Sequence, residues 1–452
     1  MRIKLDIPLS VYEIASFCDG SFLSQNIIID HIVTDSREVE NGDLFFYLGK
    51  DKDLERIYVN EALQKGGITV STYYGENVLS VKSPCDALLS LAKRYVELLP
   101  NLRYKIAVTG SIGKTTTKEI LNKILSSKYI SHSTNGNYNN HIGVPLTLLS
   151  APKETEILVV EMGMNHSGEI QKLSECLAPD LGIITNIGSS HIGNLGSREA
   201  IAKAKSEIIC GMEKPIVIVP LEENLLAEIP GKISFSTKDS NANFYIKKQE
   251  SNRVKIYQNG ILFCDTNFYP TAPYLLNCLA PAVATATICT MNSEEIKYLI
   301  SNITDDISRQ KLINIGNLYF YEDFYNASYE SILSSFESIK CLNHKGSKSL
   351  LLGDIGELGE YSDSIHFAVG KSIPKELFSN LYFFGNQADN LRCGALRGGY
   401  SDTQIFTNTD ISRPEITTMQ IKSTAENGEL VLMKASRFMK LERILDYFQS
   451  KE

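Results

Sequence analysis

The segment KIAVTGSIGKTTTKEIL, which begins at residue 105, constrains the fold more than any other part of the chain. An apolar run ends at Thr109, a short turn with two glycines follows, and a helix-forming stretch begins at Lys114. Glycines in such a turn let consecutive N–H groups point at phosphate oxygens, and the start of the helix adds partial positive charge. The segment therefore predicts a phosphate-binding loop between a strand and a helix, as in parallel α/β sheets.

The residue types in this loop suit a nucleoside triphosphate with its metal ion. Lys114 is expected on the outer phosphates, and the Thr115 hydroxyl is a ligand for Mg²⁺. The complete P-loop pattern has a further glycine where this chain has Val108, so an ordinary turn between strand and helix stays open as an alternative. The predicted nucleotide-binding residues of the loop are Gly110, Ser111, Gly113, Lys114, Thr115 and Thr116.

The surrounding pattern predicts three α/β domains. From residue 105 to about 220, short apolar runs alternate with helical patterns, which indicates βαβ units and a parallel sheet. Residues 233–270 contain short strand-like segments before an alanine-rich helical stretch, and the α/β pattern resumes near residue 309. At about 150 residues per domain, we expect a small α/β N-terminal domain, a central P-loop parallel-sheet ATPase domain and a C-terminal Rossmann-like α/β domain. Their predicted ranges are 1–100, 101–308 and 309–452.

Composition narrows the classes of partner. The formal net charge is −8 and no basic tract is present, which argues against nucleic acid as a ligand. No stretch reaches the ~18 apolar residues of a membrane span, and the start lacks the basic and apolar regions of a signal peptide. The nine cysteines lack metal-ligand spacing. Reduced thiols in the cytoplasm are therefore expected.

Six further segments occur in a fixed order along the chain: HSTNGNYNNHIGVPLTLL, EILVVEMGMNHSGEI, ITNIGSSHIGNLGSREAIAKAKSEI, EDFYNASYESI, LLLGDIGELGE and VLMKASRFMKLE. In order and spacing they resemble the Mur ligases, and TDSREVENGDLFF near the start resembles that family's nucleotide-sugar domain. The resemblance covers about residues 31–445. It implies an ATP-dependent, ADP-forming ligase that joins a carboxylate to an amine through an acyl-phosphate. The most similar branch adds D-alanyl-D-alanine to UDP-N-acetylmuramoyl-tripeptide in cytoplasmic peptidoglycan precursor synthesis.

The residues themselves fit this chemistry. A carboxylate is a poor electrophile, so a site that activates it must neutralise phosphate charge and align three reactants. Glu161 ends an apolar strand at the sheet edge where ligands bind, and its carboxylate suits Mg²⁺. The resemblance implies that Thr115 and Glu161 hold one Mg²⁺, while His191 and a carbamylated Lys205 hold a second. Lys203 is also available, but the AKSEI match selects Lys205.

The resemblance assigns further roles by position. Lys114, Lys205, His191 and Asn140 are the expected catalytic residues. Asn277 matches an adenine contact, Arg309 a phosphate contact and Asp323 a ribose contact. The residues expected at the nucleotide-sugar peptide and the amine are Asp35, Ser36, Arg37, Asn139, His141, Tyr325, Asn326, Lys434, Ser436 and Arg437. The partners expected are these small molecules, with no nucleic acid and no membrane, and the chain is expected to be a monomer.

Several positions depart from the family pattern. They are Ile112 in the loop, residues 53–58 in place of D-G-H-x-F-I, residues 273–275 before Asn277, residues 328–329 and Ala435. The departures fall mainly where substrates are recognised, so the reaction type is better defined than the substrates.

Three other readings stay open. They are a divergent Mur-type ligase acting on another carboxylate, or one resembling folylpolyglutamate or cyanophycin synthetases; an inactive or regulatory binding subunit; and a simple P-loop kinase or NTPase. The Mg²⁺ set at Thr115, Glu161, His191 and Lys205 argues against an inactive subunit. The motifs at Asp323 and Lys434 are not required by a simple NTPase.

Overall fold

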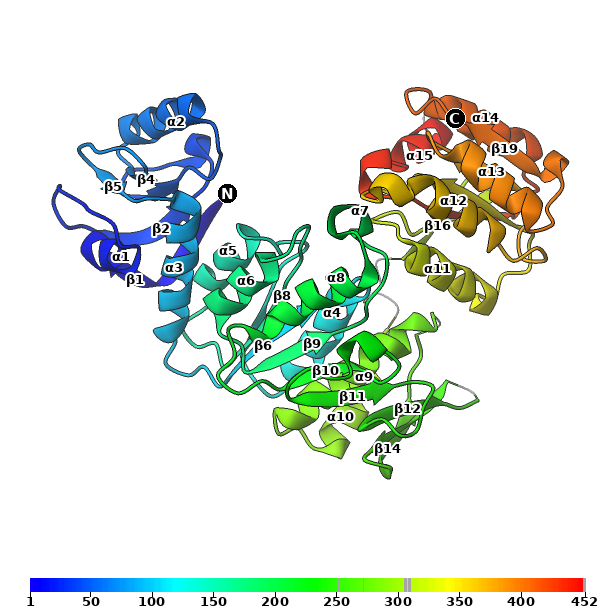
Figure 1. Ribbon diagram of the computed structural model, residues 1–452, viewed down its shortest axis with the longest axis horizontal. Coiled ribbons are helices and arrows are strands. Elements are labelled where there is room, and N and C mark those ends of the chain that lie inside the picture. The colour runs from blue at the N-terminus through cyan, green and yellow to red at the C-terminus, as the bar shows by residue number, and fades with distance from the viewer. Residues whose placement is uncertain (251, 271, 305–306, 308–309, 450–452) are drawn as a thin grey trace.

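The protein is described by a computed structural model that covers residues 1–250, 252–270, 272–304, 307 and 310–449. Three α/β lobes follow one another along the chain, and the N-terminal and C-terminal lobes stand on either side of the central one (Figure 1). Each lobe is built on its own sheet, so the predicted three-part α/β fold is confirmed. The boundaries near residues 100 and 308 stay a prediction, and the second lies beside residues outside the described part.

The N-terminal lobe contains a five-stranded sheet in the order β1-β2-β3-β4-β5. β1 runs antiparallel to β2, and the other neighbours are parallel. The strands are β1 (Arg2–Ser10), β2 (Ile28–Val33), β3 (Leu44–Phe46), β4 (Ile68–Ser71) and β5 (Val78–Ser80). The helices are α1 (Val11–Phe17), η1 (Ser36–Glu38), α2 (Lys52–Gln64) and α3 (Pro84–Glu97).

The central lobe contains a nine-stranded sheet in the order β14-β13-β12-β11-β10-β9-β6-β8-β7. It is parallel from β7 to β12, and an antiparallel hairpin completes it. The strands are β6 (Tyr104–Thr109), β7 (Ser131–Ser133), β8 (Ile157–Glu161), β9 (Leu181–Ile184), β10 (Val217–Pro220), β11 (Lys232–Ser236), β12 (Phe244–Lys248), β13 (Arg253–Gln258) and β14 (Ile261–Asn267).

Helices cover both faces of this central sheet. They are α4 (Lys114–Leu125), α5 (Gly143–Leu149), α6 (Glu169–Leu177), α7 (Ile192–Leu195), α8 (Arg198–Ser206), η2 (Glu207–Ile209), η3 (Asn224–Leu226), α9 (Tyr274–Ile288) and α10 (Ser293–Ile300). In β6, Ala107 belongs to one hydrophobic core, and Ile106 and Val108 belong to another. Burial on both faces explains why the parallel strands are almost continuously apolar in sequence.

Helix α3 joins the first lobe to the second. It packs against α5 and α6, and its residues Leu91 and Tyr95 share a core with Ala107 of the central sheet. The Tyr95 hydroxyl accepts from the backbone N–H groups of Asp6 and Ile7, at 3.0 and 3.1 Å. The buried apolar face of this helix is therefore the surface by which the two lobes are attached.

The C-terminal lobe contains a six-stranded sheet in the order β15-β16-β20-β17-β18-β19. β15 and β16 are antiparallel, and the other pairs are parallel. The strands are β15 (Lys311–Ile315), β16 (Leu318–Glu322), β17 (Lys348–Gly353), β18 (Leu381–Phe384), β19 (Ile405–Asn408) and β20 (Leu430–Lys434). The helices are α11 (Tyr329–Cys341), η5 (Gly359–Tyr361), α12 (Ser362–Lys371), α13 (Ala388–Arg397), η6 (Asp402–Gln404), α14 (Pro414–Thr424), η7 (Arg437–Met439) and α15 (Glu442–Gln449).

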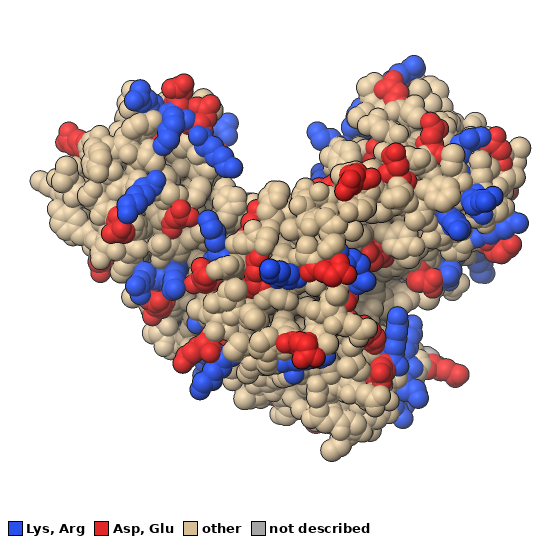
Figure 2. Space-filling view, viewed as in Figure 1, with Lys and Arg blue, Asp and Glu red and all other residues tan. Residues whose placement is uncertain are grey.

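The surface view shows a wide hollow between the N-terminal and C-terminal lobes (Figure 2). Basic and acidic side chains are mixed over this face, and neither sign gathers into one large patch. Within the described residues, no helix combines the length and apolar character that crossing a bilayer would need.

Candidate active site

The phosphate loop lies where the sequence predicts it. β6 ends at Thr109, and α4 begins at Lys114. Gly110 has a φ of 146°, and a Cβ atom there would lie 1.9 Å from the Thr185 hydroxyl oxygen, so a side chain has no room. The same hydroxyl donates to the Ile112 carbonyl at 2.5 Å. The loop therefore packs closely on the end of the neighbouring strand β9.

Asn186 holds this loop from the side, and the sequence analysis missed it. Its Oδ1 atom accepts from the backbone N–H groups of Ser111 and Ile112, at 3.0 and 2.9 Å. Asn186 follows β9, which pairs with β6, so both segments leave the sheet at the same edge. The rule that ligands bind at this edge was available from sequence and could have drawn attention to Asn186.

Two lysines of the predicted site lie close enough to repel each other. The Lys114 ammonium donates to the carbonyls of Gly110 and Ser111, at 2.8 and 3.2 Å. Lys205 is 1% exposed, on α8. Burial, together with repulsion from Lys114, holds the pKa of Lys205 well below the ordinary 10.5 of a lysine amine. The Lys205 amine therefore loses its proton more readily than an exposed lysine amine.

Glu161 is the buried carboxylate of the site. It ends β8, and its two oxygens accept from the Thr115 hydroxyl and the Asn139 amide, each at 2.7 Å. This arrangement brings together the two residues expected to bind Mg²⁺. Among the described residues, no three His, Cys, Asp or Glu side chains form a metal-binding group. One carboxylate and one hydroxyl nevertheless suit Mg²⁺, which commonly completes its ligands with phosphate and water oxygens.

His191 lies in the segment after β9 and contacts the C-terminal lobe. Its Nδ1 atom lies 2.5 Å from Oε2 of Glu357, a residue that the sequence analysis did not single out. The contact with His191 lowers the pKa of the Glu357 carboxyl below its ordinary value. Asn140 lies just before α5, and its Oδ1 accepts from the N–H groups of Ile142 and Gly143.

The C-terminal lobe contributes a buried ion pair. The Lys434 ammonium lies 2.9 Å from Asp323, at the ends of the neighbouring strands β20 and β16. Asp323 also accepts from the Gln310 amide at 2.9 Å and the Ser335 hydroxyl at 2.5 Å. The proposed ribose and amine residues are therefore adjacent and bonded to each other.

A cavity of about 520 Å³ joins these groups between the central and C-terminal lobes. Asn277, which accepts a hydrogen bond from Thr237, lies on its wall. The expected site residues that line this cavity are Ser111, Gly113, Lys114, Thr115, Thr116, Asn139, Asn140, Glu161, His191, Asn277, Asp323, Tyr325, Asn326 and Lys434. Residues that lie far apart in the sequence thus converge on one cavity.

Other expected residues lie elsewhere. Asp35, Ser36 and Arg37 follow β2 in the N-terminal lobe, where Arg37 pairs with Asp35 and the Ser36 hydroxyl donates to Glu61. His141 is exposed and is not among the residues lining the cavity. The Ser436 hydroxyl accepts from the Gly356 N–H, and Arg437 pairs with Glu442 at the surface. Arg309 lies outside the described residues.

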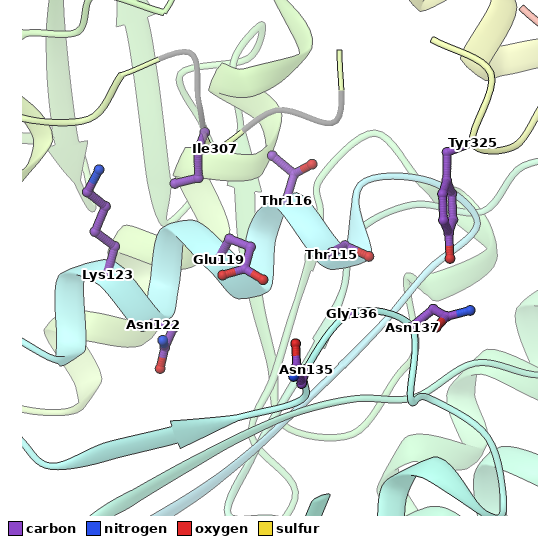
Figure 3. A pocket seen from close by; sticks show the side chains of 10 residues that line it. All are labelled: Thr115, Thr116, Glu119, Asn122, Lys123, Asn135, Gly136, Asn137, Ile307 and Tyr325. Atoms are coloured by element: carbon purple, nitrogen blue, oxygen red, sulfur yellow. The ribbon is translucent and has the colours of Figure 1, made fainter. Parts of the chain in front are cut away.

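A second, more open groove of about 730 Å³ continues from the cavity along α4 (Figure 3). It extends past Glu119, Asn122 and Lys123, and it shares Thr115, Thr116, Asn137 and Tyr325 with the cavity. In Figure 3, the Tyr325 side chain points from the C-terminal lobe toward the loop that carries Asn137. The α4 helix therefore borders both the phosphate loop and this polar groove.

Comparison with known proteins identifies the class of this site. The sequence pattern of the Mur ligase middle domain matches residues 108–285. The UDP-N-acetylmuramoyl-tripeptide–D-alanyl-D-alanine ligase of Bacillus subtilis strain 168 is 32% identical, over 97% of this chain and 98% of the relative. The chain belongs to the Mur ligase family.

Solved structures point to one branch within that family. MurF from Acinetobacter baumannii has a TM-score of 0.86 and 26% identity, over 99% of this chain and 100% of that chain. MurF from Thermotoga maritima, solved in complex with ADP, has a TM-score of 0.78 and 26% identity over 93% and 97%. The similarity to this D-alanyl-D-alanine-adding branch extends over all three lobes.

Proposed function

We propose that this protein joins D-alanyl-D-alanine to UDP-N-acetylmuramoyl-tripeptide, with ATP converted to ADP and phosphate. The observation that carries the proposal is the convergence of the phosphate loop, Thr115 with Glu161, and the Asp323–Lys434 pair on one interlobe cavity. Relatives that bear this activity in their names match nearly the whole chain. The reaction places the enzyme in peptidoglycan precursor synthesis, and we propose a cytoplasmic monomer.

The chemistry proceeds in two displacements. A carboxylate oxygen of the peptide attacks the γ-phosphorus of ATP, and the bond to the bridging oxygen breaks to release ADP. The amine nitrogen of D-alanyl-D-alanine then attacks the acyl carbon, phosphate leaves, and the nitrogen loses a proton. Lys114 and the loop N–H groups favour this path because they offset the negative charge that gathers around the phosphoryl group.

We propose that Thr115 and Glu161 hold one Mg²⁺ at the phosphates. The ion would supply charge neutralisation between the ATP phosphates and the incoming carboxylate. Asn139 supports this role, since its hydrogen bond fixes one oxygen of Glu161 and leaves the carboxylate oriented toward Thr115. Ser111, Gly113 and Thr116 would complete the contacts to phosphate.

We further propose that Lys205 is carbamylated and, with His191, holds a second Mg²⁺. Only a neutral amine adds to carbon dioxide, and the low pKa of Lys205 favours that form. The carbamate would be an anion next to the Lys114 ammonium, so the repulsion between two lysines would become an attraction. A carbamate oxygen, unlike an ammonium, is a ligand for Mg²⁺.

The remaining contacts follow the family pattern, and the Asp323–Lys434 pair would rearrange when substrates bind. Asn277 would bind adenine and Arg309 the phosphates. Asp323 would bind the ribose hydroxyls, and Lys434 would turn toward the amine substrate when this pair opens. Tyr325, Asn326, Ser436, Arg437, Asn140 and His141 are proposed around the reacting groups, and Asp35, Ser36 and Arg37 at the uridine diphosphate.

Phosphate release measured against a panel of UDP-muramoyl peptides and amines tests the proposal. We expect turnover only when a UDP-muramoyl-tripeptide and D-alanyl-D-alanine are present together. Turnover with a single amino acid, or with a carboxylate that has no uridine, would replace this proposal by a Mur-type ligase of another pathway.

A further inference from the structure

A carboxylate of the C-terminal lobe reaches into the strand-end loop of the central sheet. Glu330 lies in the first turn of α11, and Oε1 accepts from the Ser189 N–H at 2.8 Å while Oε2 accepts from the Ser189 hydroxyl at 2.9 Å. Ser189 is buried. The two carboxylate oxygens of Glu330 therefore accept from both donors of Ser189, across the boundary between the C-terminal and central lobes.

The loop that Glu330 holds also touches the phosphate loop. The Gly188 N–H donates to the Ser111 hydroxyl oxygen at 2.8 Å, and Asn186, two residues earlier, holds Ser111 and Ile112. A Cβ atom on Gly188 would lie 2.9 Å from Cδ of Glu330 and 3.2 Å from Cβ of Ser111. Gly188 is thus packed between the C-terminal carboxylate and the phosphate loop, and a side chain there would displace Glu330 or Ser111.

Further contacts fix the other end of the same segment. The Gly193 N–H donates to the Glu357 carbonyl at 3.0 Å, and the Tyr361 hydroxyl donates to the Gly196 carbonyl at 2.8 Å. Glu357 also pairs with His191. These contacts can hold the C-terminal lobe in place without Glu330, so the role of Glu330 is separable from docking of the lobe.

We infer that Glu330 is a positioning residue of the C-terminal lobe. It holds the phosphate loop in its binding conformation through contacts with Ser189, Gly188 and Ser111. Glu330 is not among the residues that line the nucleotide cavity, so it acts through the loop and not on the nucleotide. The consequence is that tight binding of ATP phosphates requires a seated C-terminal lobe. The inference rests on the nucleotide site of the proposed function and adds the residue that couples it to the neighbouring lobe.

The test is calorimetric titration of the full chain with Mg²⁺ and a non-hydrolysable ATP analogue, without the other substrates. Glu330→Gln keeps the size of the side chain but removes its charge and one acceptor. We expect analogue binding about tenfold weaker, as for loss of one charge-assisted hydrogen bond. Glu337→Gln is the matched control, because Glu337 lies on the same helix in a surface pair with Lys340. It should bind like the wild type.

A double-mutant cycle makes the assignment specific. Ser189→Ala removes one of the two donors. If Glu330 acts through Ser189, the affinity of the double variant for the analogue should fall by a smaller factor than the product of the two single-variant factors. Gly188→Ala gives a second, independent perturbation of the same path and should also weaken analogue binding. Additive effects of Glu330→Gln and Ser189→Ala, or wild-type affinity in Glu330→Gln, would overturn the inference.

One further measurement separates positioning from docking. We expect the radius of gyration from small-angle scattering of Glu330→Gln to equal that of Glu337→Gln. A larger radius of gyration, accompanying the weaker binding, would show that Glu330 only docks the lobe and would overturn the inference. Because the titration needs no ligation, a wild type that binds the analogue but makes no amide would refute the proposed function alone.

Discussion

Glu161 shows how much of the site depends on single side chains. It is 1% exposed, and hydrogen bonds to Thr115 and Asn139 keep both oxygens in place. Leaving a buried carboxylate without partners is costly, so these bonds stabilise it until a cation binds. The carboxylate is thus preorganised at the end of the phosphate loop.

Removing Glu161 or Lys114 should abolish ligation while the fold stays intact. We expect Glu161→Ala and Lys114→Ala each to lower kcat by ~100-fold or more, because each loses a preorganised charge contact. Phosphate release measures the rate, and circular dichroism checks the fold. Glu154→Gln, at an exposed glutamate of the same lobe, serves as the control. Near-wild-type turnover in either alanine variant would contradict the role proposed for that residue.

The Lys205→Ala variant should be inactive, and a small carboxylate should partly restore its activity. The variant leaves space next to Lys114 that acetate can enter, restoring an anion where the carbamate is proposed. We expect partial recovery of phosphate release with acetate in Lys205→Ala, and stimulation by bicarbonate only in the wild type. Exposed Lys203→Ala, on the same helix, should behave like the wild type. Full activity of Lys205→Ala in carbon dioxide-free buffer would exclude the carbamate.

At the scale of elements, the sequence predicted those strands, helices and turns that have a periodic or local residue pattern. The apolar patterns located β6 and α9, and the two glycines located the phosphate loop. The contacts of Ser189 with Glu330 and of His191 with Glu357 had no such signal, because they join residues more than a hundred positions apart whose side chains are common surface types. Only the packing of one lobe on another defines them.

The phosphate loop depends on the element beside it, which leads to a prediction for Asn186. Asn186→Ala removes the acceptor of two loop N–H groups, so we expect the KM for ATP to rise about tenfold. The KM for the muropeptide should stay unchanged. Asn241→Ala is the matched control, because Asn241 is an exposed asparagine of the same lobe whose bond to Asp239 is made by its backbone. Steady-state kinetics with each substrate varied in turn measures both constants. Equal increases in the two KM values would mean a general loss of structure.

For the whole molecule, the arrangement of lobes assigns the substrates to different places. The nucleotide cavity lies between the central and C-terminal lobes, whereas Asp35 and Arg37 lie on the N-terminal lobe. Helix α2 now occupies residues 52–64, where the family motif D-G-H-x-F-I is absent. Its buried Glu55 bonds to Ser71 and Thr72 and anchors the helix to β4. The uridine end of the proposed substrate would therefore meet a surface that differs from the family pattern.

Arg37 provides the test of this surface. Its guanidinium is 81% exposed and bonds Asp35 through two nitrogens, at 2.9 and 2.6 Å. A guanidinium with donors left over is suited to a diphosphate, and Asp35 holds it in one orientation. We expect calorimetric titration with UDP-N-acetylmuramoyl-tripeptide to show binding that Arg37→Ala weakens about tenfold. Arg94→Ala, at an exposed surface pair in the same lobe, should bind like the wild type.

If Arg37→Ala binds equally well, the Asp35–Arg37 pair only shapes the turn after β2. If the wild type itself shows no binding at millimolar ligand, the substrate is not a uridine-linked muropeptide, and the ligase acts on another carboxylate.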